Sequence, residues 1–384
     1  MMNQTEDRPT VVEAYIEGSL LSLISVTAMF GNLSMWLIIC RTRDLRTYTN
    51  YFILSLSLAD LFVAVVNMPV TVITLFMRGW IMSDSACKVF GYLNMLTLVT
   101  SVMSLCNISI NRYIMVCRPI HFKSIYTKWK SAAMIAACFG TSVLLSSPPL
   151  FGWAEYSFIQ IQSFCFCDWT KAPSYAFFMI GTCFGIPFSV MTVCNIQIFR
   201  RVRASKKRVS AFNKTNNDET LTKHQRKTKN CFSSNDDHDK MFVVSKRISK
   251  EMSLSASNEL YSAVDEVTVV VDGETACAFN NNENHKTLKK ELRKVRQKAR
   301  AEEIRLATAL AVVVVVFVIC WLPYCFSMLI SIYNPLAAPR AFHMGTLLIG
   351  YANSCCNPVI YGVMNKKFAD GYHRLYCSKC IRGR

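Results

Sequence analysis

Hydrophobic residues gather in seven long blocks along the chain rather than alternating with polar ones. At ~1.5 Å per residue, a helix of each block is long enough to cross the ~30 Å hydrocarbon core of a bilayer. In lipid every backbone N–H and C=O must be paired within the protein, which favours helices for stretches of this length. The pattern therefore predicts an all-α membrane protein, a seven-transmembrane helix bundle. The blocks are Leu20–Cys40, Tyr51–Phe76, Phe90–Val116, Ala132–Phe151, Tyr175–Ile198, Ile304–Ile332 and Phe342–Val363.

The blocks divide the chain into five parts. An amino-terminal tail (1–17) precedes helices one to five (18–199), a long polar loop (200–303), helices six and seven (304–364), and a final stretch (365–384). The loop is rich in Ser, Asn and Lys, so we expect it to be largely disordered. The final stretch has the spacing of an amphipathic helix that lies on the membrane surface.

The positive charge of the chain is confined to alternate connecting segments. The net charge is +18, and 24 of the 43 Lys and Arg residues lie in Arg200–Arg305. Most others lie in Arg41–Arg46, Arg118–Lys130 and Lys366–Arg384, each beside a segment almost without basic residues. This is the positive-inside pattern, which predicts an extracellular amino terminus and a cytoplasmic loop in a multi-pass plasma-membrane protein. The distribution argues against nucleic acid as a partner.

Cysteine and asparagine positions suggest covalent modification. Of 17 cysteines, Cys87, Cys165 and Cys167 fall in segments predicted to face outside, so one disulfide with one cysteine left over is expected. Asn3 begins a glycosylation sequon. Cys377 and Cys380 are palmitoylation candidates, with free cytosolic thiols as the alternative.

Polar residues and prolines interrupt several apolar blocks. Asp60 is an intramembrane acid, which by default suggests a functional site; the alternative is a structural hydrogen-bond hub with Asn32. Proline within a helix removes a backbone hydrogen bond and creates a kink. The interruptions are Pro187, the sequence Cys320-Trp321-Leu322-Pro323 and the sequence Asn357-Pro358-Val359-Ile360-Tyr361.

These features, with Asn111-Arg112-Tyr113 at the end of the third block, occur in an order that resembles the rhodopsin-like (class A) G-protein-coupled receptors. The resemblance covers all seven helices and the short final helix. It implies a receptor that passes an extracellular small-molecule signal to a heterotrimeric G protein by outward movement of helix six. Membrane lipid and arrestin are further candidate partners.

The resemblance also implies roles for individual residues. Cys87 would pair with Cys165 rather than Cys167, and Arg112 would pair with Glu303 in the inactive state and meet the G protein in the active state. A sodium ion, the one metal expected, would lie among Asp60, Ser101, Asn353 and Asn357. The activation switch would consist of Pro187, Phe317, Trp321, Pro323, Pro358 and Tyr361.

The chain departs from the family pattern at the residue before the arginine. Asn111 stands where the family usually has an acid, which would weaken the inactive-state contact and raise basal activity. A receptor that signals without a ligand is therefore the main alternative. Neither a transporter nor an enzyme fits as well, because we find no internal repeat and the six histidines do not cluster within the membrane.

The expected pocket lacks the charge that an amine needs. Asn94 stands where amine receptors place an aspartate, and a buried cation without a counter-charge is costly. Tyr351 stands where opsins hold the lysine that forms a Schiff base, which disfavours a photopigment. We expect a neutral, partly aromatic ligand and no cofactor; a local likeness to melatonin receptors is clearest in 353–368. The expected pocket is Asn94, Met95, Leu98, Trp321, Tyr324, Cys325, Met328 and Tyr351.

Overall fold

The computed structural model describes residues 8–204, 282–334 and 337–377, with backbone only for 282–304, 306, 307 and 310. The chain forms two units, one of Met1–Ile198 with Leu306–Arg384 and the other of Phe199–Arg305. Only the first unit is described below. Asn3, Cys380 and most of the predicted cytoplasmic loop lie outside the described residues, as does the side chain of Glu303.

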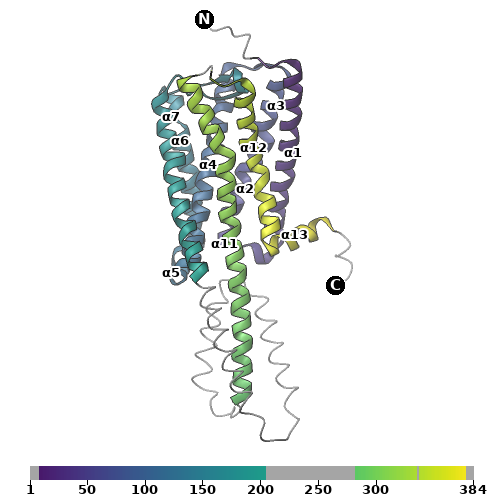
Figure 1. Cartoon of the computed structure of the whole chain (residues 1–384), viewed down its shortest axis with the longest axis vertical. Coiled ribbons are helices and arrows are strands. Elements are labelled where there is room, and N and C mark those ends of the chain that lie inside the picture. The colour runs from purple at the N-terminus through teal and green to yellow at the C-terminus, as the bar shows by residue number, and fades with distance from the viewer. Residues whose placement is uncertain (1–7, 205–281, 335–336, 378–384) are drawn as a thin grey trace. The chain divides into compact units, whose positions relative to one another are not determined.

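Long helices stand side by side in the first unit, and the short helix α13 leaves the end of α12 at a steep angle (Figure 1). The bundle helices are α1 (Val11–Arg41), α2 (Tyr48–Phe62) with α3 (Met68–Phe76), α4 (Asp84–Cys117), α6 (Lys128–Ser146), α7 (Pro173–Met179) within a span that runs to Ala204, α11 (Asn282–Tyr333) and α12 (Arg340–Met364); α5 (Pro119–Ile125) and α13 (Lys366–Tyr376) are short. Two strands, β1 (Tyr156–Ile159) and β2 (Phe164–Cys167), form the small sheet of the described chain.

Six helical segments of the described chain are long and apolar enough to cross a membrane. Helix α12 takes the seventh place in the bundle and packs against α1. It does not reach the same apolar composition because it buries polar side chains against its neighbours. These are His343, Thr346, Asn353, Ser354 and Asn357.

Two π-helical turns precede prolines within the bundle. The turns are Val63–Asn67, just before Pro69, and Ile180–Gly185, just before Pro187. A proline lacks the N–H that the preceding turn would bond, and a wider turn is one way to accommodate it. The sequence suggested a distortion at Pro187, whereas the turn before Pro69 was not anticipated. For brevity we call Val63–Asn67 the π turn.

Helix α6 ends at Ser146 because Pro148 and Pro149 follow, and proline cannot continue the backbone ladder. Two tyrosine hydroxyls donate to the carbonyl oxygens left at this end. Tyr175 donates to Leu145 and Tyr156 to Ser146, each over 2.7 Å. Tyrosines thus connect β1 and α7 to the end of α6 and satisfy carbonyls that would otherwise be buried without a partner.

Strands β1 and β2 form an antiparallel hairpin in the register Tyr156↔Cys167. All four residues of β2 are buried, because the hairpin folds over the bundle and packs on α4. Gly91 of α4 allows this approach, since an added Cβ would lie 2.9 Å from the ring of Tyr156. We call this the hairpin end of the bundle and the opposite end, beside α13, the α13 end.

Buried apolar residues form two clusters. The hairpin-end cluster includes Met95, Tyr175 and Tyr351, and the α13-end cluster includes Phe317 and Tyr361. Trp321 and Phe184 are partly buried and pack against both clusters. A displacement of Trp321 would therefore change the packing of both clusters, because close-packed interiors transmit strain.

Candidate functional site

A cavity lies within the bundle beneath the hairpin. Its empty volume is about 480 Å³, part of which is open to solvent. Half of the lining residues are aromatic or aliphatic, and most of the others carry amides or hydroxyls, a mixture found in small-molecule sites. The lining residues are Asp60, Val63, Asn67, Asn94, Thr97, Leu98, Ser101, Phe164, Phe166, Trp321, Tyr324, Leu347, Gly350, Tyr351, Asn353 and Ser354.

The lining overlaps the pocket expected from the sequence only in part. Asn94, Leu98, Trp321, Tyr324 and Tyr351 line the cavity, but the other three expected residues do not. Met95 and Met328 are buried in the hairpin-end cluster, and Cys325 is a half-buried free thiol. Met95 and Cys325 each follow a lining residue, and one step along a helix turns a side chain by about 100°.

The ligand pocket expected from the sequence omitted the hairpin and the π turn. Phe164 and Phe166 of β2 cover the cavity, and Asn67 lines it from the end of the π turn. No periodicity marked the hairpin residues, whereas Pro69 within an apolar block was a usable signal for the distortion next to Asn67.

A disulfide fixes the hairpin to α4. Cys165 of β2 bonds Cys87 in the first turn of α4, while Cys167 is a buried free cysteine. The disulfide expected from the family resemblance is therefore present. Burial raises the pKa of the Cys167 thiol, which keeps it protonated and unreactive.

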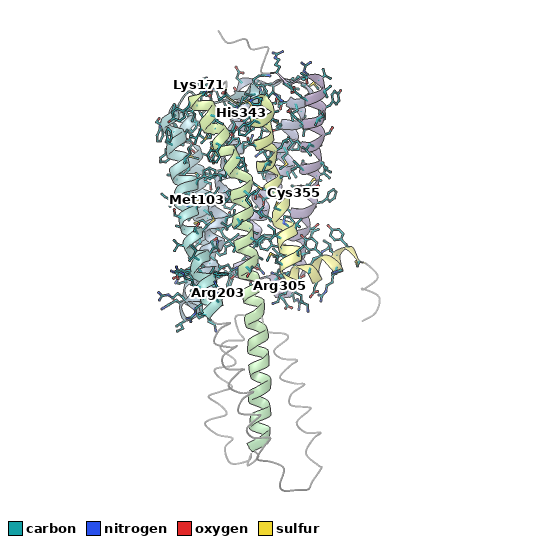
Figure 2. All side chains as sticks on the ribbon, viewed as in Figure 1. Met103, Lys171, Arg203, Arg305, His343 and Cys355 are labelled. Carbon is teal, nitrogen blue, oxygen red and sulfur yellow. A yellow bond between two sulfur atoms is a disulfide. The ribbon has the colours of Figure 1, made fainter. Side chains whose placement is uncertain are left out.

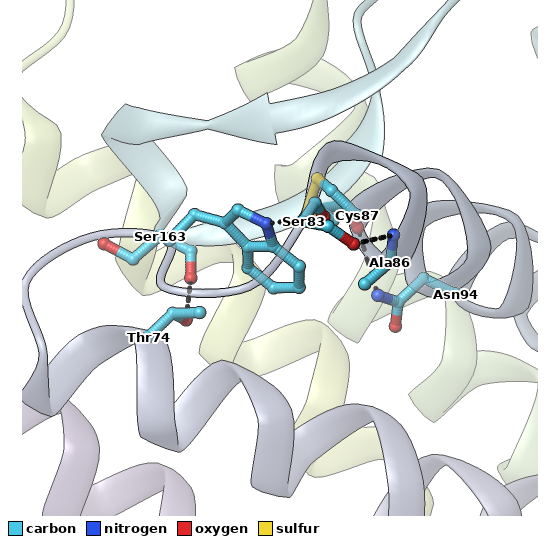
Figure 3. Close-up of a disulfide and its surroundings, with 8 residues drawn as sticks. Thr74, Ser83, Ala86, Cys87, Asn94 and Ser163 are labelled. Atoms are coloured by element: carbon cyan, nitrogen blue, oxygen red, sulfur yellow. Dashed lines mark hydrogen bonds between the residues drawn. A yellow bond between two sulfur atoms is a disulfide. The ribbon is translucent and has the colours of Figure 1, made fainter.

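Hydrogen bonds hold the hairpin and the start of α4 in place (Figure 3). Ser83 caps α4 by accepting from the Ala86 N–H over 3.2 Å, and its carbonyl accepts from the Trp80 indole over 3.1 Å. The Thr74 hydroxyl donates to the Ser163 carbonyl at the turn of the hairpin. The cover of the cavity is thus bonded to both α3 and α4.

An ion pair fixes the hairpin turn to α1 and α12. Arg340 Nη1 lies 2.6 Å from Glu17 Oε1, with the two side chains 9% and 12% exposed. The second arm of the guanidinium donates to Ser163 Oγ over 3.1 Å.

Nearby, the Gln162 amide donates to the carbonyl of His343, whose ring is hydrogen-bonded to the Ser327 hydroxyl over 2.6 Å. His343 lies at this end in Figure 2.

Both ends of the Asn94 amide are engaged. Its Nδ2 donates to the Cys165 carbonyl over 3.1 Å, and its Oδ1 accepts from the Tyr351 hydroxyl over 3.4 Å. The residue that replaces the aspartate of amine receptors therefore ties the hairpin to α12. It leaves no acidic group at this level of the cavity.

Asp60 forms the floor of the cavity and is 1% exposed. Its carboxylate accepts from Asn357 Nδ2 over 2.7 Å and from Ser354 Oγ over 3.3 Å. Asn32 donates to the Ser354 carbonyl over 2.9 Å. Pro358 has no N–H to bond that carbonyl, so the Asn32 side chain takes the place of the missing helical bond. The expected link between Asn32 and Asp60 thus passes through Ser354.

The floor has the donor set of a hard monovalent cation. Asp60, Ser101 and Asn353 line the same cavity, as expected, and Ser354 adds a hydroxyl that was not expected. Among the described residues no cluster of three or more His, Cys, Asp or Glu side chains could hold another metal. One carboxylate with neutral oxygens fits sodium, and Asn357, which donates its N–H to Asp60, supports the carboxylate.

Aromatic rings run from the hairpin to the α13-end cluster. Centroid distances are 6.2 Å for Phe166–Tyr324, 5.8 Å for Tyr324–Trp321 and 6.2 Å for Trp321–Phe317. Phe188, next to Pro187, continues the series at 5.8 Å from Phe317. These spacings are those of interacting rings. We call this series the ring chain.

Two glycines make room for the residues of the proposed switch. A Cβ on Gly350 would lie 3.1 Å from the Trp321 ring, and one on Gly31 would lie 2.9 Å from Pro358. Pro323 lies within α11 and Pro358 within α12. Because Gly350 has no side chain, the ring of Trp321 packs directly on the backbone of α12.

The expected G-protein-coupling residues lie at the α13 end. Asn111 and Arg112 are buried and Tyr113 is half-buried. Tyr126 stacks near Phe122 with centroids 5.0 Å apart. Burial raises the pKa of Tyr126 to about 12, against an opposing effect of Asn111. The ion pair of Arg112 with Glu303 stays a prediction, because the Glu303 side chain is not described.

Helix α13 buries Phe368 and Gly371 against the bundle. Gly371 allows a close approach to α1, since its Cβ would meet Ile38. Cys377 follows the helix, is exposed and lies 3.9 Å from His373 Nδ1. The short helix predicted after helix seven is therefore present, and palmitoylation of Cys377 stays a prediction.

A covered cavity connected through the ring chain to the opposite end of the bundle fits a membrane receptor. A model of the family described as 7 transmembrane receptor (rhodopsin family) matches residues 31–361. The chain belongs to this family of G-protein-coupled receptors.

Comparison with known proteins gives the same class. A tyramine receptor of Caenorhabditis elegans is 27% identical over 94% of this chain and 83% of its own length. The alpha-1D adrenergic receptor of Rattus norvegicus is 27% identical over 96% of this chain, which spans only 58% of that receptor. Squid rhodopsin shares the fold with a TM-score of 0.68 and 22% identity, over 98% of this chain and 89% of its own.

These comparisons place the chain among multi-pass plasma-membrane receptors and not among enzymes. One relative is a tyramine receptor by name, which contrasts with the neutral ligand expected from Asn94. The local likeness to melatonin receptors stays a prediction.

Proposed function

We propose that the protein binds a small, uncharged, partly aromatic molecule from outside the cell and activates a heterotrimeric G protein. The ring chain carries this proposal, since it connects the cover of the cavity to the core at the α13 end. The amino terminus would be extracellular, with Asn3 glycosylated and Cys377 and Cys380 palmitoylated. Arrestin and membrane lipid would be further partners.

The proposed mechanism is a shift between two packings of the core. A ligand that displaces Tyr324 or Trp321 would move rings that also contact the α13-end cluster. Helix α11, the sixth helix of the bundle, would then swing outward at the hinge of Pro323. Pro187, Phe317 and Pro358 would repack, and Tyr361 would turn inward. Arg112 would exchange Glu303 for the G protein, and sodium at Asp60 would favour the inactive packing. A ligand shifts such an equilibrium only by its differential affinity for the two states.

The test is cyclic AMP in cells that express the chain, with the variant Arg112→Ala as control. A panel would contain tyramine, N-acetyltyramine, melatonin and adenosine. The proposal expects a ligand-dependent change in the parent receptor that disappears in Arg112→Ala at equal surface expression. An equal response in both proteins would contradict the proposed role of Arg112.

Signalling without a ligand is the second candidate function. Asn111 supports it, because a neutral amide stands where the family usually has an acid. In this case the parent receptor would shift the cyclic AMP baseline, and Asn111→Asp would lower that shift. An unchanged baseline in Asn111→Asp would count against this candidate.

A further inference from the structure

The unpaired polar atoms of the cavity are informative about the ligand. Among the described lining residues, two buried side-chain atoms lack a hydrogen-bond partner, the Asn67 oxygen Oδ1 and the Trp321 nitrogen Nε1. An unpaired buried polar atom costs free energy, because it has lost its hydration without gaining a partner. A ligand that pairs these atoms would recover that free energy on binding.

The orientation of the Asn67 amide follows from the bonds of Thr97. The Thr97 hydroxyl has one proton, which goes to the carbonyl of Leu93 at 2.9 Å or of Asn94 at 3.0 Å. With its proton on one of these carbonyls, the hydroxyl accepts from Asn67 Nδ2 over 3.0 Å. The Asn67 nitrogen faces Thr97, so the free atom is the oxygen, an acceptor.

Two other polar side chains of the cavity, Asn94 and Asp60, are already engaged. Asn94 bonds Cys165 and Tyr351, and Asp60 accepts from Ser354 and Asn357. Asn67 is 1% exposed, so water at the surface does not satisfy it. An acceptor that is buried and unpaired beside a cavity is satisfied by a water or by a ligand, and a ligand that fills the cavity would have to supply the donor in place of that water.

The charge of that donor follows from its surroundings. Asn67 is neutral, and the acid of the lining, Asp60, lies on the floor with its oxygens bonded. An ammonium at Asn67 would lose its hydration without gaining a counter-charge, whereas a neutral N–H or O–H would lose little. An amide group has an N–H for Asn67 and a carbonyl for the Trp321 indole.

We propose that Asn67 is the ligand-anchoring residue of the cavity, and that the ligand is a small aromatic molecule presenting an uncharged N–H or O–H donor, such as an amide. This inference rests on the proposed function, since it assumes that the cavity is the signal-binding site. It differs from the expectation based on the sequence, which placed the discriminating group at Asn94.

The test compares two probes that differ in charge. Tyramine carries an ammonium, and N-acetyltyramine replaces it with a neutral amide on the same phenol. Binding is measured on the purified full-length receptor by ligand-induced thermal stabilisation, which requires no G protein. Failure of the proposed function would appear only in the cyclic AMP assay, so the two can be told apart.

The expected result is stronger binding of N-acetyltyramine to the parent receptor. Asn67→Leu should weaken it by about tenfold, the effect of one buried hydrogen bond. Asn67→Asp should shift the preference toward tyramine by about tenfold or more, which a merely structural role would not do. Thr71→Val is the matched control, because Thr71 bonds the Asn67 backbone over 3.1 Å but does not line the cavity.

The following outcomes would each overturn the inference. They are stronger binding of tyramine than of N-acetyltyramine by the parent receptor, equal losses in Asn67→Leu and Thr71→Val, and no binding of N-acetyltyramine at all. An unchanged probe preference in a folded Asn67→Asp receptor would equally exclude Asn67 as the anchor.

Discussion

The two ends of the bundle are held together in different ways. At the hairpin end, polar and covalent bonds join segments far apart in sequence, including the Cys87–Cys165 disulfide and the pair of Glu17 with Arg340. At the α13 end, the described side chains meet mainly through apolar and aromatic packing, as Tyr361 does with Phe368. Hydrogen bonds depend on direction and apolar packing does not. The difference indicates a cavity that is largely preformed above a core that can repack.

The largest effect is expected at the disulfide. It closes a loop with a sequence separation of 78, and removing a bond of this kind costs about 2–5 kcal/mol. Cys87→Ser should therefore lower the melting temperature of the purified receptor and abolish ligand binding. Cys167→Ser is the control in the same hairpin and should change both far less. Equal losses in the two variants would contradict the distinct role of Cys165.

The ion pair should give the next largest effect. Arg340→Met leaves Glu17 buried without its partner, and losses of this kind amount to about 3–5 kcal/mol for fully buried pairs, with less expected here because the pair is partly exposed. Glu17→Gln together with Arg340→Met should cost less than Arg340→Met alone. Thermal unfolding of Glu17→Gln, Arg340→Met and the double variant measures the coupling. Strict additivity of the two substitutions would show that the pair contributes no coupling energy.

The α13 end should separate stability from signalling. The Tyr361 hydroxyl is buried and has no hydrogen-bond partner among the described residues. Tyr361→Phe should therefore change stability by less than about 1 kcal/mol, or raise it, because it removes an unpaired polar atom. If the hydroxyl is used only in the active packing, the same variant should signal several-fold less at equal surface expression. A large loss of stability would show that the hydroxyl is already used in the packing described here.

The smallest effect is expected at an exposed pair of the hairpin end. Lys171 bonds Glu155 over 2.6 Å, with side chains 53% and 46% exposed. The lysine lowers the pKa of Glu155, so the contribution is present above the ordinary carboxyl pKa and lost as pH falls through the lowered value. Glu155→Gln should change the free energy of unfolding at neutral pH by less than about 1 kcal/mol. A larger loss would show that exposed pairs also hold this end.

The sequence predicts the parts that depend on composition and spacing. The helices follow from apolar length, and Cys87–Cys165 follows from the family pattern. The cover of Phe164 and Phe166 could not be predicted, because it depends on where the hairpin folds back. Met95 shows a second limit of prediction from the sequence. Adjacent helix positions face different ways, and of the neighbours Asn94 and Met95 only Asn94 lines the cavity. Asn67 was missed because its orientation depends on a local distortion.

The π turn Val63–Asn67 also affects how the receptor can change over generations. One extra residue in a helical turn rotates everything beyond it by about 100°. Loss of one residue from the turn would thus rotate α3 and change the residues that it contacts, whereas α2 would keep its contacts. A single-residue deletion at the turn would therefore change more contacts than a single substitution within α3. An alignment with a relative whose second helix lacks this turn needs a one-residue gap within Val63–Asn67 to match the positions of α3.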